Sequence, residues 1–154
     1  MHQPILHAEH HRSWAEEYAA SLVSAYAPDC IILFGSVARQ EQAPDSDIDI
    51  LVIGGNLPEN QRQRFRLLMR LRPRFAPIQV QSFSRAEWER MVTVRHVTIL
   101  EALNDGVALY GQRLFGRWRR QFERWQQLGL RRERCAWILP SDLKMAARSM
   151  VVHE

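Results

Sequence analysis

Two aspartates, Asp47 and Asp49, stand one residue apart within residues 31–53, IILFGSVARQEQAPDSDIDILVI. Because side chains alternate along a β-strand, these two project to one face, while Ile48 and Ile50 project to the other. Two neighbouring carboxylates repel each other, and a divalent cation relieves that repulsion. Hard oxygen ligands of this kind suit Mg²⁺. The spacing therefore predicts a magnesium site formed by Asp47 and Asp49.

A glycine-serine turn precedes the two aspartates. The apolar run 31–34 predicts a buried strand, Gly35 and Ser36 predict a turn, and a short helix is expected from Val37. Glycine allows the backbone to approach a ligand closely, and the free N–H groups at the start of a helix bind anions. One loop can thus hold a phosphate group while the next strand holds the metal ion that binds it.

The order of these features, Gly-Ser, ten residues and then Asp-x-Asp, resembles the signature of the polymerase-β-like nucleotidyltransferases. The flanking sequences LFGSVAR and DSDIDILV are most similar to those of the minimal nucleotidyltransferases (MNT), the antitoxins that are paired with HEPN toxins. The resemblance covers about residues 13–112 and is strongest over 33–53. It implies an α/β fold, with a small mixed sheet flanked by helices and a C-terminal helical tail.

The resemblance also implies an activity, which is Mg²⁺-dependent transfer of AMP from ATP to a hydroxyl group. A tyrosine of a HEPN-type toxin is the favoured acceptor, which would make this chain an antitoxin. In this comparison Asp47 and Asp49 would be the catalytic residues and the ligands of the Mg²⁺ cofactor. The nucleotide would be held by Gly35, Ser36, Arg39 and Ser46. For Arg39 the sequence leaves a second role open, an ion pair with Asp45 or Glu41.

One position departs from the family pattern. A strand is predicted over residues 78–83, and the third carboxylate expected there is replaced by Gln79. A neutral amide oxygen coordinates Mg²⁺ only weakly, and the amide cannot act as a base at neutral pH. Glu41 and Glu87 are candidates to replace the missing acid. The substitution keeps a second function open, a binding module that neutralises its partner protein by contact.

Charge is distributed unevenly along the chain and raises two further alternatives. Residues 1–60 carry two arginines and nine acids, a net −7, whereas residues 61–154 carry a net +11. Stripes such as Arg62, Arg66 and Arg70 could bind RNA, although solvated helix faces have the same pattern. An antibiotic-modifying nucleotidyltransferase is the other alternative, but such enzymes usually have a larger second domain.

The chain of 154 residues is expected to form a nucleotidyltransferase domain over 1–112 and a helical extension over 113–154. The extension has an aromatic helical face, and we expect this face to pack on the domain or to contact a second copy or a toxin. No apolar run reaches transmembrane length, so a cytoplasmic protein with two reduced cysteines, Cys30 and Cys135, is expected. The aromatic face consists of Phe115, Trp118, Phe122 and Trp125.

Apolar periodicity and capping residues predict the remaining elements. Residues before 13 have no pattern and are expected to form a disordered or surface lead-in. A capping box at Ser84 and Glu87 predicts the start of another helix. The predicted helices span 13–26, 58–71, 85–91 and 94–104, with a last strand over 107–110 and a final helix near 143–150.

Overall fold

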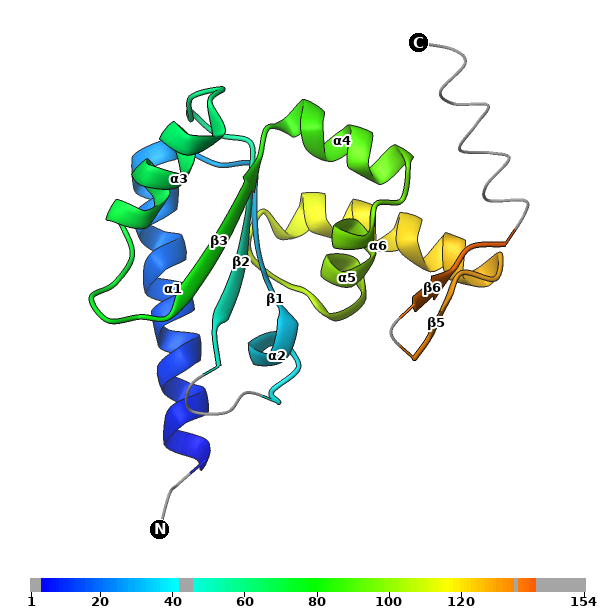
Figure 1. The fold of residues 1–154 in the computed structure, drawn as a ribbon, viewed down its shortest axis with the longest axis horizontal. Coiled ribbons are helices and arrows are strands. Elements are labelled where there is room, and N and C mark those ends of the chain that lie inside the picture. The colour runs from blue at the N-terminus through cyan, green and yellow to red at the C-terminus, as the bar shows by residue number, and fades with distance from the viewer. Residues whose placement is uncertain (1–3, 42–45, 135, 141–154) are drawn as a thin grey trace.

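A four-stranded mixed sheet forms the centre of the computed structural model, which describes residues 4–41, 46–134 and 136–140. The strands lie in the order β3-β2-β1-β4, and Figure 1 labels the first three of them. The central strand β1 runs antiparallel to both β2 and β4, and β2 runs parallel to β3. The predicted small mixed sheet is therefore confirmed. The strands are β1 (Cys30–Phe34), β2 (Ile48–Ile53), β3 (Ile78–Phe83) and β4 (Val107–Tyr110).

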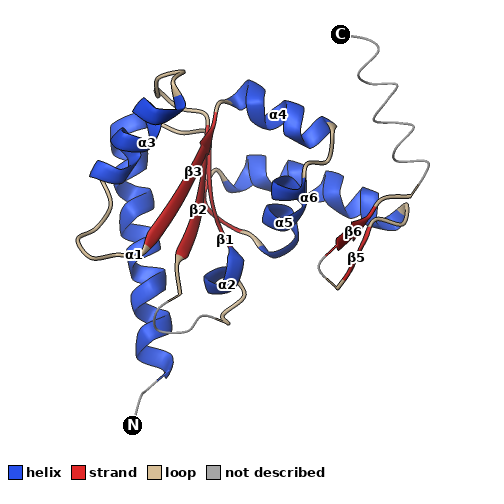
Figure 2. Ribbon diagram, in the orientation of Figure 1, coloured by secondary structure: helices blue, strands red, loops and turns tan. Residues whose placement is uncertain are grey.

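Two helices, α1 (Pro4–Tyr26) and α3 (Gln61–Arg70), cover one face of the sheet (Figure 2). Tyr18 and Leu68 are almost completely buried there. The Tyr18 hydroxyl donates a hydrogen bond of 2.7 Å to the carbonyl oxygen of Leu68, which joins the two helices. Burial raises the pKa of the Tyr18 hydroxyl well above its ordinary value. This face of the sheet is a packed core in which the buried Tyr18 hydroxyl is hydrogen-bonded.

Three helices cover the opposite face: α4 (Arg85–Thr93), α5 (Val97–Asp105) and α6 (Gln112–Gln127). The predicted aromatic face of the C-terminal extension belongs to α6. Trp118, Phe122 and Trp125 are buried in the same cluster as Ile32 and Leu51 of the sheet. Of the roles open for this face, the structure therefore shows packing on the domain itself.

Local capping accounts for where two helices begin. Ser84 accepts a hydrogen bond from the Glu87 amide, and the Glu87 side chain accepts one from the Ser84 amide, so the predicted capping box is confirmed. Helix α3 begins later than predicted, because Asn60 rather than Pro58 caps it, with a bond of 3.1 Å from the Gln63 amide. Side-chain caps satisfy donors that the helix itself leaves unpaired.

The surface lead-in expected before residue 13 is wrong, because α1 already begins at Pro4. Ser13 thus lies inside the helix, and His11 is only 2% exposed. A long packed helix has overridden weak local periodicity, since tertiary burial outweighs propensity. The short helix expected after the glycine turn is present as α2 (Gly35–Ala38). A hairpin of β5 (Arg131–Glu133) and β6 (Ala136–Ile138) was not predicted from the sequence.

The remaining predictions concern the two cysteines, the last helix and membrane spans. Cys30 is free and buried, and burial raises the pKa of its thiol to about 12. Cys135 and the helix expected near 143–150 lie outside the described residues. Within the described residues, every helix is too short or too polar to cross a bilayer.

Candidate active site

The predicted aspartate pair lies where β2 enters the sheet. Asp47 immediately precedes β2, and Asp49 is its second residue. Ile48 and Ile50 are completely buried on the α1 side, so alternation turns the two aspartates toward the other face. The pairing register aligns Asp49 with Phe34 at the end of β1 and with Gln79 on β3. Strand register therefore brings residues far apart in the sequence to one end of the sheet.

The glycine turn lies directly against Asp49. Gly35 has φ +76°, and a Cβ placed on it would lie 2.3 Å from Asp49 Oδ2. Such a contact is impossible, so any larger residue would displace the carboxylate. Phe34, the residue that caps α2, offers no side-chain hydrogen bond. The first N–H groups of α2, beginning with Ser36, therefore have no side-chain cap beside the carboxylate.

Electrostatics at the pair is unfavourable in the protein alone. Burial of Asp49 raises the pKa of its carboxyl group, the Asp47 carboxylate raises it further, and Arg39 opposes both effects. Asp49 is half-buried, whereas Asp47 is exposed. A divalent cation between the two would compensate both the burial and the repulsion. The pair and its glycine cradle therefore fit a metal ion bound to phosphate.

Gln79 occupies the position of the expected third carboxylate and contacts the pair. Its Nε2 donates a hydrogen bond of 2.8 Å to Asp47 Oδ2. The described residues contain no group of three or more His, Cys, Asp or Glu side chains that could hold a metal ion. A cation at this position would therefore depend on Asp47, Asp49 and oxygens brought by a ligand or by water.

The two glutamates considered as replacements for that acid are engaged elsewhere. Glu41 accepts a hydrogen bond of 3.0 Å from Arg39 Nε. Glu87 caps α4 and pairs at 3.3 Å with Arg64, whose side chain is 3% exposed. Helix α4 follows the far end of β3, about 13 Å along the strand from Gln79 at 3.3 Å per residue. Glu87 therefore does not replace the missing carboxylate.

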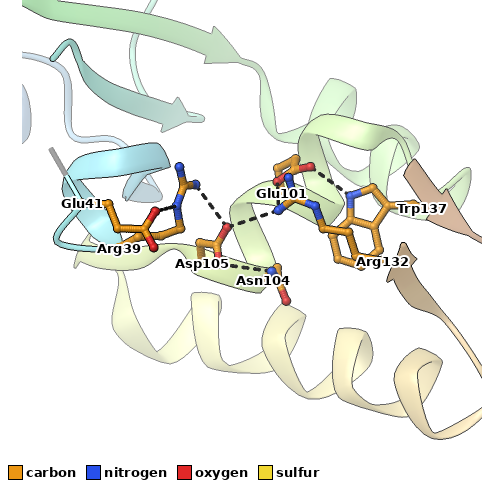
Figure 3. A network of polar contacts seen from close by, with 7 residues as sticks. All are labelled: Arg39, Glu41, Glu101, Asn104, Asp105, Arg132 and Trp137. Atoms are coloured by element: carbon orange, nitrogen blue, oxygen red, sulfur yellow. Dashed lines mark hydrogen bonds and ion pairs between the residues drawn. The ribbon is translucent and has the colours of Figure 1, made fainter. Parts of the chain in front are cut away.

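Arg39 forms ion pairs with acidic residues on both sides (Figure 3). Besides Glu41, it contacts Asp105 at the end of α5, with 3.4 Å between Nη1 and Oδ2. These contacts raise the pKa of the Arg39 guanidinium, with the Glu41 hydrogen bond the largest cause. The structure thus shows the ion-pair role that the sequence left open, with Glu41 as a partner. Arg39 is also near enough to Asp49 to affect its carboxylate.

Asp105 is the residue that sequence reasoning missed. It accepts hydrogen bonds from Asn104 and Arg39 and lies 3.9 Å from Arg132 of the hairpin. Arg132 also pairs with Glu101 of α5 at 3.3 Å. Figure 3 shows these side chains forming one chain of contacts from α2 to the hairpin. No sequence signal marks Asp105, because its partners come from three separate segments.

The remaining predicted site residue, Ser46, is half-buried and directly precedes Asp47. The structure thus gathers Gly35, Asp47 and Asp49, with Ser36 and Ser46 as their chain neighbours. These residues could bind a metal-bound phosphate. Arg39 lies beside them but is directed to α5.

The chain is similar to a known protein family. Residues 17–112 match the family model described as polymerase beta, nucleotidyltransferase. The match covers the glycine turn, both aspartates and all four strands of the sheet. Among curated proteins, none matches the chain significantly.

Solved structures share the fold at low sequence identity. A putative nucleotidyltransferase from Sulfolobus solfataricus is 21% identical, with a TM-score of 0.50 over 68% of this chain and 84% of that one. A toxin–antitoxin structure with AMP-PNP is 19% identical, with a TM-score of 0.52 over 90% of this chain and 96% of that one. A mutant of the toxin–antitoxin MntA–HpeT is 17% identical, with a TM-score of 0.50 and the same coverage.

These structures support the predicted fold, and the family model extends over more than half of the chain. Gly35, Asp47 and Asp49 lie within the matched residues. This chain belongs to the polymerase-β-type nucleotidyltransferase family.

Proposed function

We propose that this protein is a Mg²⁺-dependent nucleotidyltransferase that transfers AMP from ATP to a hydroxyl group, with a tyrosine of a HEPN-type toxin as the acceptor. One observation carries the proposal: the Asp49 carboxylate lies against the Gly35 backbone, in register with Gln79 and beside Asp47. Two carboxylates that could hold a metal ion and a glycine turn that could bind phosphate thus lie at one end of the sheet, which supports nucleotidyl transfer.

The roles of the residues follow from their chemistry. Asp47 and Asp49 would hold Mg²⁺, which supplies positive charge to the phosphate groups when bound. The glycine turn would orient the outer phosphates through backbone N–H groups, with Ser36 beside them. Positioning of the acceptor hydroxyl in line with the leaving group accounts for much of such an acceleration.

The reaction would form one bond and break another. The acceptor oxygen attacks the α-phosphorus of ATP, and the bond from that phosphorus to the bridging oxygen breaks, so that pyrophosphate leaves with the electron pair. The Gln79 amide cannot accept the acceptor's proton, so that proton would pass to a carboxylate of the site or to water. Charge that develops on the phosphoryl oxygens is stabilised by groups already held in place.

Structural relatives support ATP and a toxin as partners. Two of them are toxin–antitoxin structures, and one contains AMP-PNP, a nucleotide analogue. The mutant among them carries two Asp-to-Glu substitutions two positions apart, the same spacing as Asp47 and Asp49. At this level of identity the relatives share the fold, so the acceptor remains our proposal.

Labelled ATP tests the activity. The purified protein would be incubated with Mg²⁺, ATP labelled at the α-phosphate and a HEPN-type toxin encoded beside it. We expect labelled toxin, and we expect Asp47→Asn and Asp49→Asn each to lower the labelling rate by at least about a hundredfold. Glu16→Gln, an exposed acid on α1 paired with Arg12, serves as the control that keeps the rate. Undiminished labelling by the aspartate variants would remove the site assignment.

A second function is favoured by the Gln79 contact. A hydrogen bond from Gln79 occupies one oxygen of Asp47 in place of the charge of a third acid. Such a site would bind nucleotide weakly, and the protein would then neutralise its partner by contact. Stable toxin binding and inhibition without ATP, together with no labelling at saturating Mg²⁺ and ATP, would favour this alternative.

A further inference from the structure

An arginine-rich surface extends along α3 and the loop that follows it. Residues 61–77 contain six arginines and no aspartate or glutamate. Arg64 is buried and pairs with Glu87. The other five are exposed, and none of them pairs with an acid among the described residues. Together with Phe65 and Phe75 they are called the α3 surface below. The five are Arg62, Arg66, Arg70, Arg72 and Arg74.

Phe65 gives the helical part of this surface an apolar centre. Arginines four positions apart share one face of α3. Phe65 lies beside them and is 51% exposed. It lines an open hollow of about 380 Å³ together with Arg62 and Arg66. Exposed aromatic side chains and arginines are the residue types that protein interfaces favour.

Phe75 is held in solvent by a strained turn. The Pro73 carbonyl oxygen accepts a hydrogen bond of 3.0 Å from the Ala76 amide, which makes Phe75 the third residue of a β-turn. Its φ is +66°, at a turn position where glycine or asparagine is usual. The ring is 83% exposed, with the Arg74 guanidinium 5.0 Å from its centre. Because a bulky residue costs stability at this φ, the fold itself does not account for Phe75.

This turn is fixed to the acidic end of the sheet. Ala76 is only 2% exposed and anchors the loop in the core beneath α1 and α3. The Pro77 carbonyl oxygen accepts a hydrogen bond of 2.8 Å from the amide of Ile48, the residue between the two aspartates. Figure 1 shows the loop from α3 to β3 at the end of the sheet where β2 begins. The α3 surface therefore ends beside the proposed catalytic site.

Strand order indicates the side from which an acceptor would approach. Asp49 on β2 lies between the glycine turn after β1 and the start of β3. In nucleotidyl transfer the attacking and leaving oxygens are roughly in line. With the outer phosphates at Gly35, pyrophosphate would leave toward β1, so the acceptor would come from the β3 side. Strand β3 is an edge of the described sheet, which leaves that side open to a partner.

We propose that the α3 surface binds the acceptor protein, whose acidic side chains would surround an apolar contact with Phe65 and Phe75. The inference rests on the proposed function, because that function supplies a protein as the acceptor. Unpaired arginines attract an acidic partner and orient it, while the two aromatic side chains provide contact area. An acceptor bound here would present its hydroxyl group to the aspartate pair from the β3 side.

An acidic protein suits this surface better than RNA does. Single-stranded RNA stacks successive bases on neighbouring aromatic rings. Phe65 lies about 7 Å along α3 from Arg70, at which the helix ends, and Phe75 lies beyond the loop. The two rings are thus too far apart to stack successive bases, and Arg74 already lies over the ring of Phe75. Separate apolar contacts between charged groups are usual where two proteins meet.

Calorimetry in EDTA with the HEPN-type toxin measures docking apart from catalysis. We expect Phe65→Ala combined with Phe75→Ala to raise the Kd for the toxin at least about tenfold. The control, Val97→Ala combined with Leu128→Ala, removes exposed apolar side chains outside the α3 surface and should change the Kd less than about twofold. Circular dichroism would verify that both variants remain folded. Toxin that binds neither variant more weakly than the wild type would overturn the proposal.

A second pair of variants distinguishes this surface from general positive charge. Arg66→Ala combined with Arg70→Ala should raise the Kd at least about fivefold and make toxin association less sensitive to salt. Arg113→Ala combined with Arg120→Ala removes the same charge from exposed positions on α6. We expect less than about a twofold change there, since only long-range attraction is reduced. Equal losses in the two double variants would contradict the proposal.

Phe75→Gly separates docking from folding. Glycine removes the ring and tolerates the positive φ, so the unfolding temperature should not fall. In the labelling assay KM for the toxin should rise at least about fivefold, while KM for ATP stays unchanged. A raised KM for ATP with an unchanged KM for the toxin would show that Phe75 contacts the nucleotide, which contradicts the proposal.

The remaining outcomes separate this inference from the proposed function. Toxin that binds through Phe65 and Phe75 but is not labelled would remove the catalysis and leave the docking surface. Labelling at an unchanged KM for the toxin in the Phe65 and Phe75 variant would remove the docking surface and leave the catalysis. A labelled 12-nucleotide RNA that requires Arg66 and Arg70, while the toxin does not, would assign this surface to RNA and overturn the proposal.

Discussion

The two ends of the sheet differ in charge and in how their groups are positioned. At one end, Asp47 and Asp49 are held by strand register and by contact with the Gly35 backbone. At the other end, Arg85 of α4 and Arg95, which follows α4, lie over the rings of Trp118 and Trp125 of α6. A side chain packed against the backbone tolerates almost no substitution. Side chains on the surface of helices can be substituted at a lower cost in stability. The comparison teaches that the two ends of the sheet call for different tests.

Alanine substitutions of Gly35 and Gly116 compare a glycine at the acidic end of the sheet with a glycine on α6. Gly35→Ala would place a Cβ 2.3 Å from Asp49 Oδ2 at a φ of +76°, so we expect AMP transfer to fall at least about a hundredfold. In the middle of α6, a Cβ on Gly116 would meet only Arg120 Nη1, at 3.6 Å. Gly116→Ala should therefore stabilise the protein by about 0.5–1 kcal/mol.

Labelling rates and thermal unfolding of both glycine variants provide the measurement. Gly35→Ala should lose activity by more than its loss of stability explains, because the left-handed backbone itself costs only about 1–2 kcal/mol. Full activity of a folded Gly35→Ala protein would show that the close approach of backbone and carboxylate is not needed.

Substitution of Gln79 by glutamate would add a third carboxylate to the acidic end of the sheet. In Gln79→Glu the hydrogen bond to Asp47 is lost and a third carboxylate joins the pair. We expect lower stability in EDTA, by about 1 kcal/mol, because like charges repel. With Mg²⁺ the stability should recover, and labelling should increase several-fold. Unfolding curves with and without Mg²⁺ would measure this, and an Mg²⁺ response no larger than that of the wild type would contradict it.

Asp105 links the acidic end to the C-terminal hairpin, and a smaller effect is expected there. Asp105→Asn removes the charge that pairs with Arg39 at 3.4 Å and with Arg132 at 3.9 Å. Arg39 would then keep only its pair with Glu41 and could turn toward the triphosphate, which should lower KM for ATP by about threefold and leave kcat nearly unchanged. Glu133→Gln, which breaks only the exposed pair with Arg131, is the control. A change in kcat alone would assign Asp105 a different role.

The smallest predicted effect concerns pH. Burial and the Asp47 carboxylate raise the pKa of Asp49 above its ordinary value, so the folded protein binds this proton more tightly than the unfolded chain does. In EDTA the Asp49 contribution to stability should therefore decrease as pH rises from the ordinary carboxyl pKa to the raised one.

Asp49→Asn removes this pH dependence. The variant should be at least as stable as the wild type at pH 7 in EDTA, and its advantage should vanish in acid. Denaturant unfolding at several pH values measures the difference. A variant that is clearly less stable at pH 7 would show that the ionised carboxylate stabilises the protein even without a cation.

The acidic end could be predicted from sequence because its parts lie within one segment. Gly35, Asp47 and Asp49 fall within residues 31–53, and alternation alone turns both acids to one face. The strand positions also followed from local patterns, and β3 and β4 span the predicted residues. The capping box of Ser84 and Glu87 was predicted and is confirmed, but nothing in the sequence predicted that Glu87 would also pair with the buried Arg64.

The groove between α4 and α6, which is lined by Arg95 and Arg117, and the Asp105 contacts could not be predicted in the same way. Arg95 lies in the turn after α4 and Arg117 lies on α6. Each is ordinary in its own segment, because arginines usually face water. Only packing of α4 beside α6 brings their charges together. The hairpin was missed because β5 and β6 have three residues each, too few for alternation to be recognised.

The most direct test of the central claim is crystallography with AMP-PNP and Mn²⁺ in place of Mg²⁺. Anomalous scattering would locate the metal ion. We expect a peak about 2.1 Å from oxygens of both Asp47 and Asp49, with phosphate oxygens completing its coordination beside Gly35. A nucleotide bound with its metal away from these two carboxylates, or phosphates distant from the glycine turn, would contradict the assignment of this site.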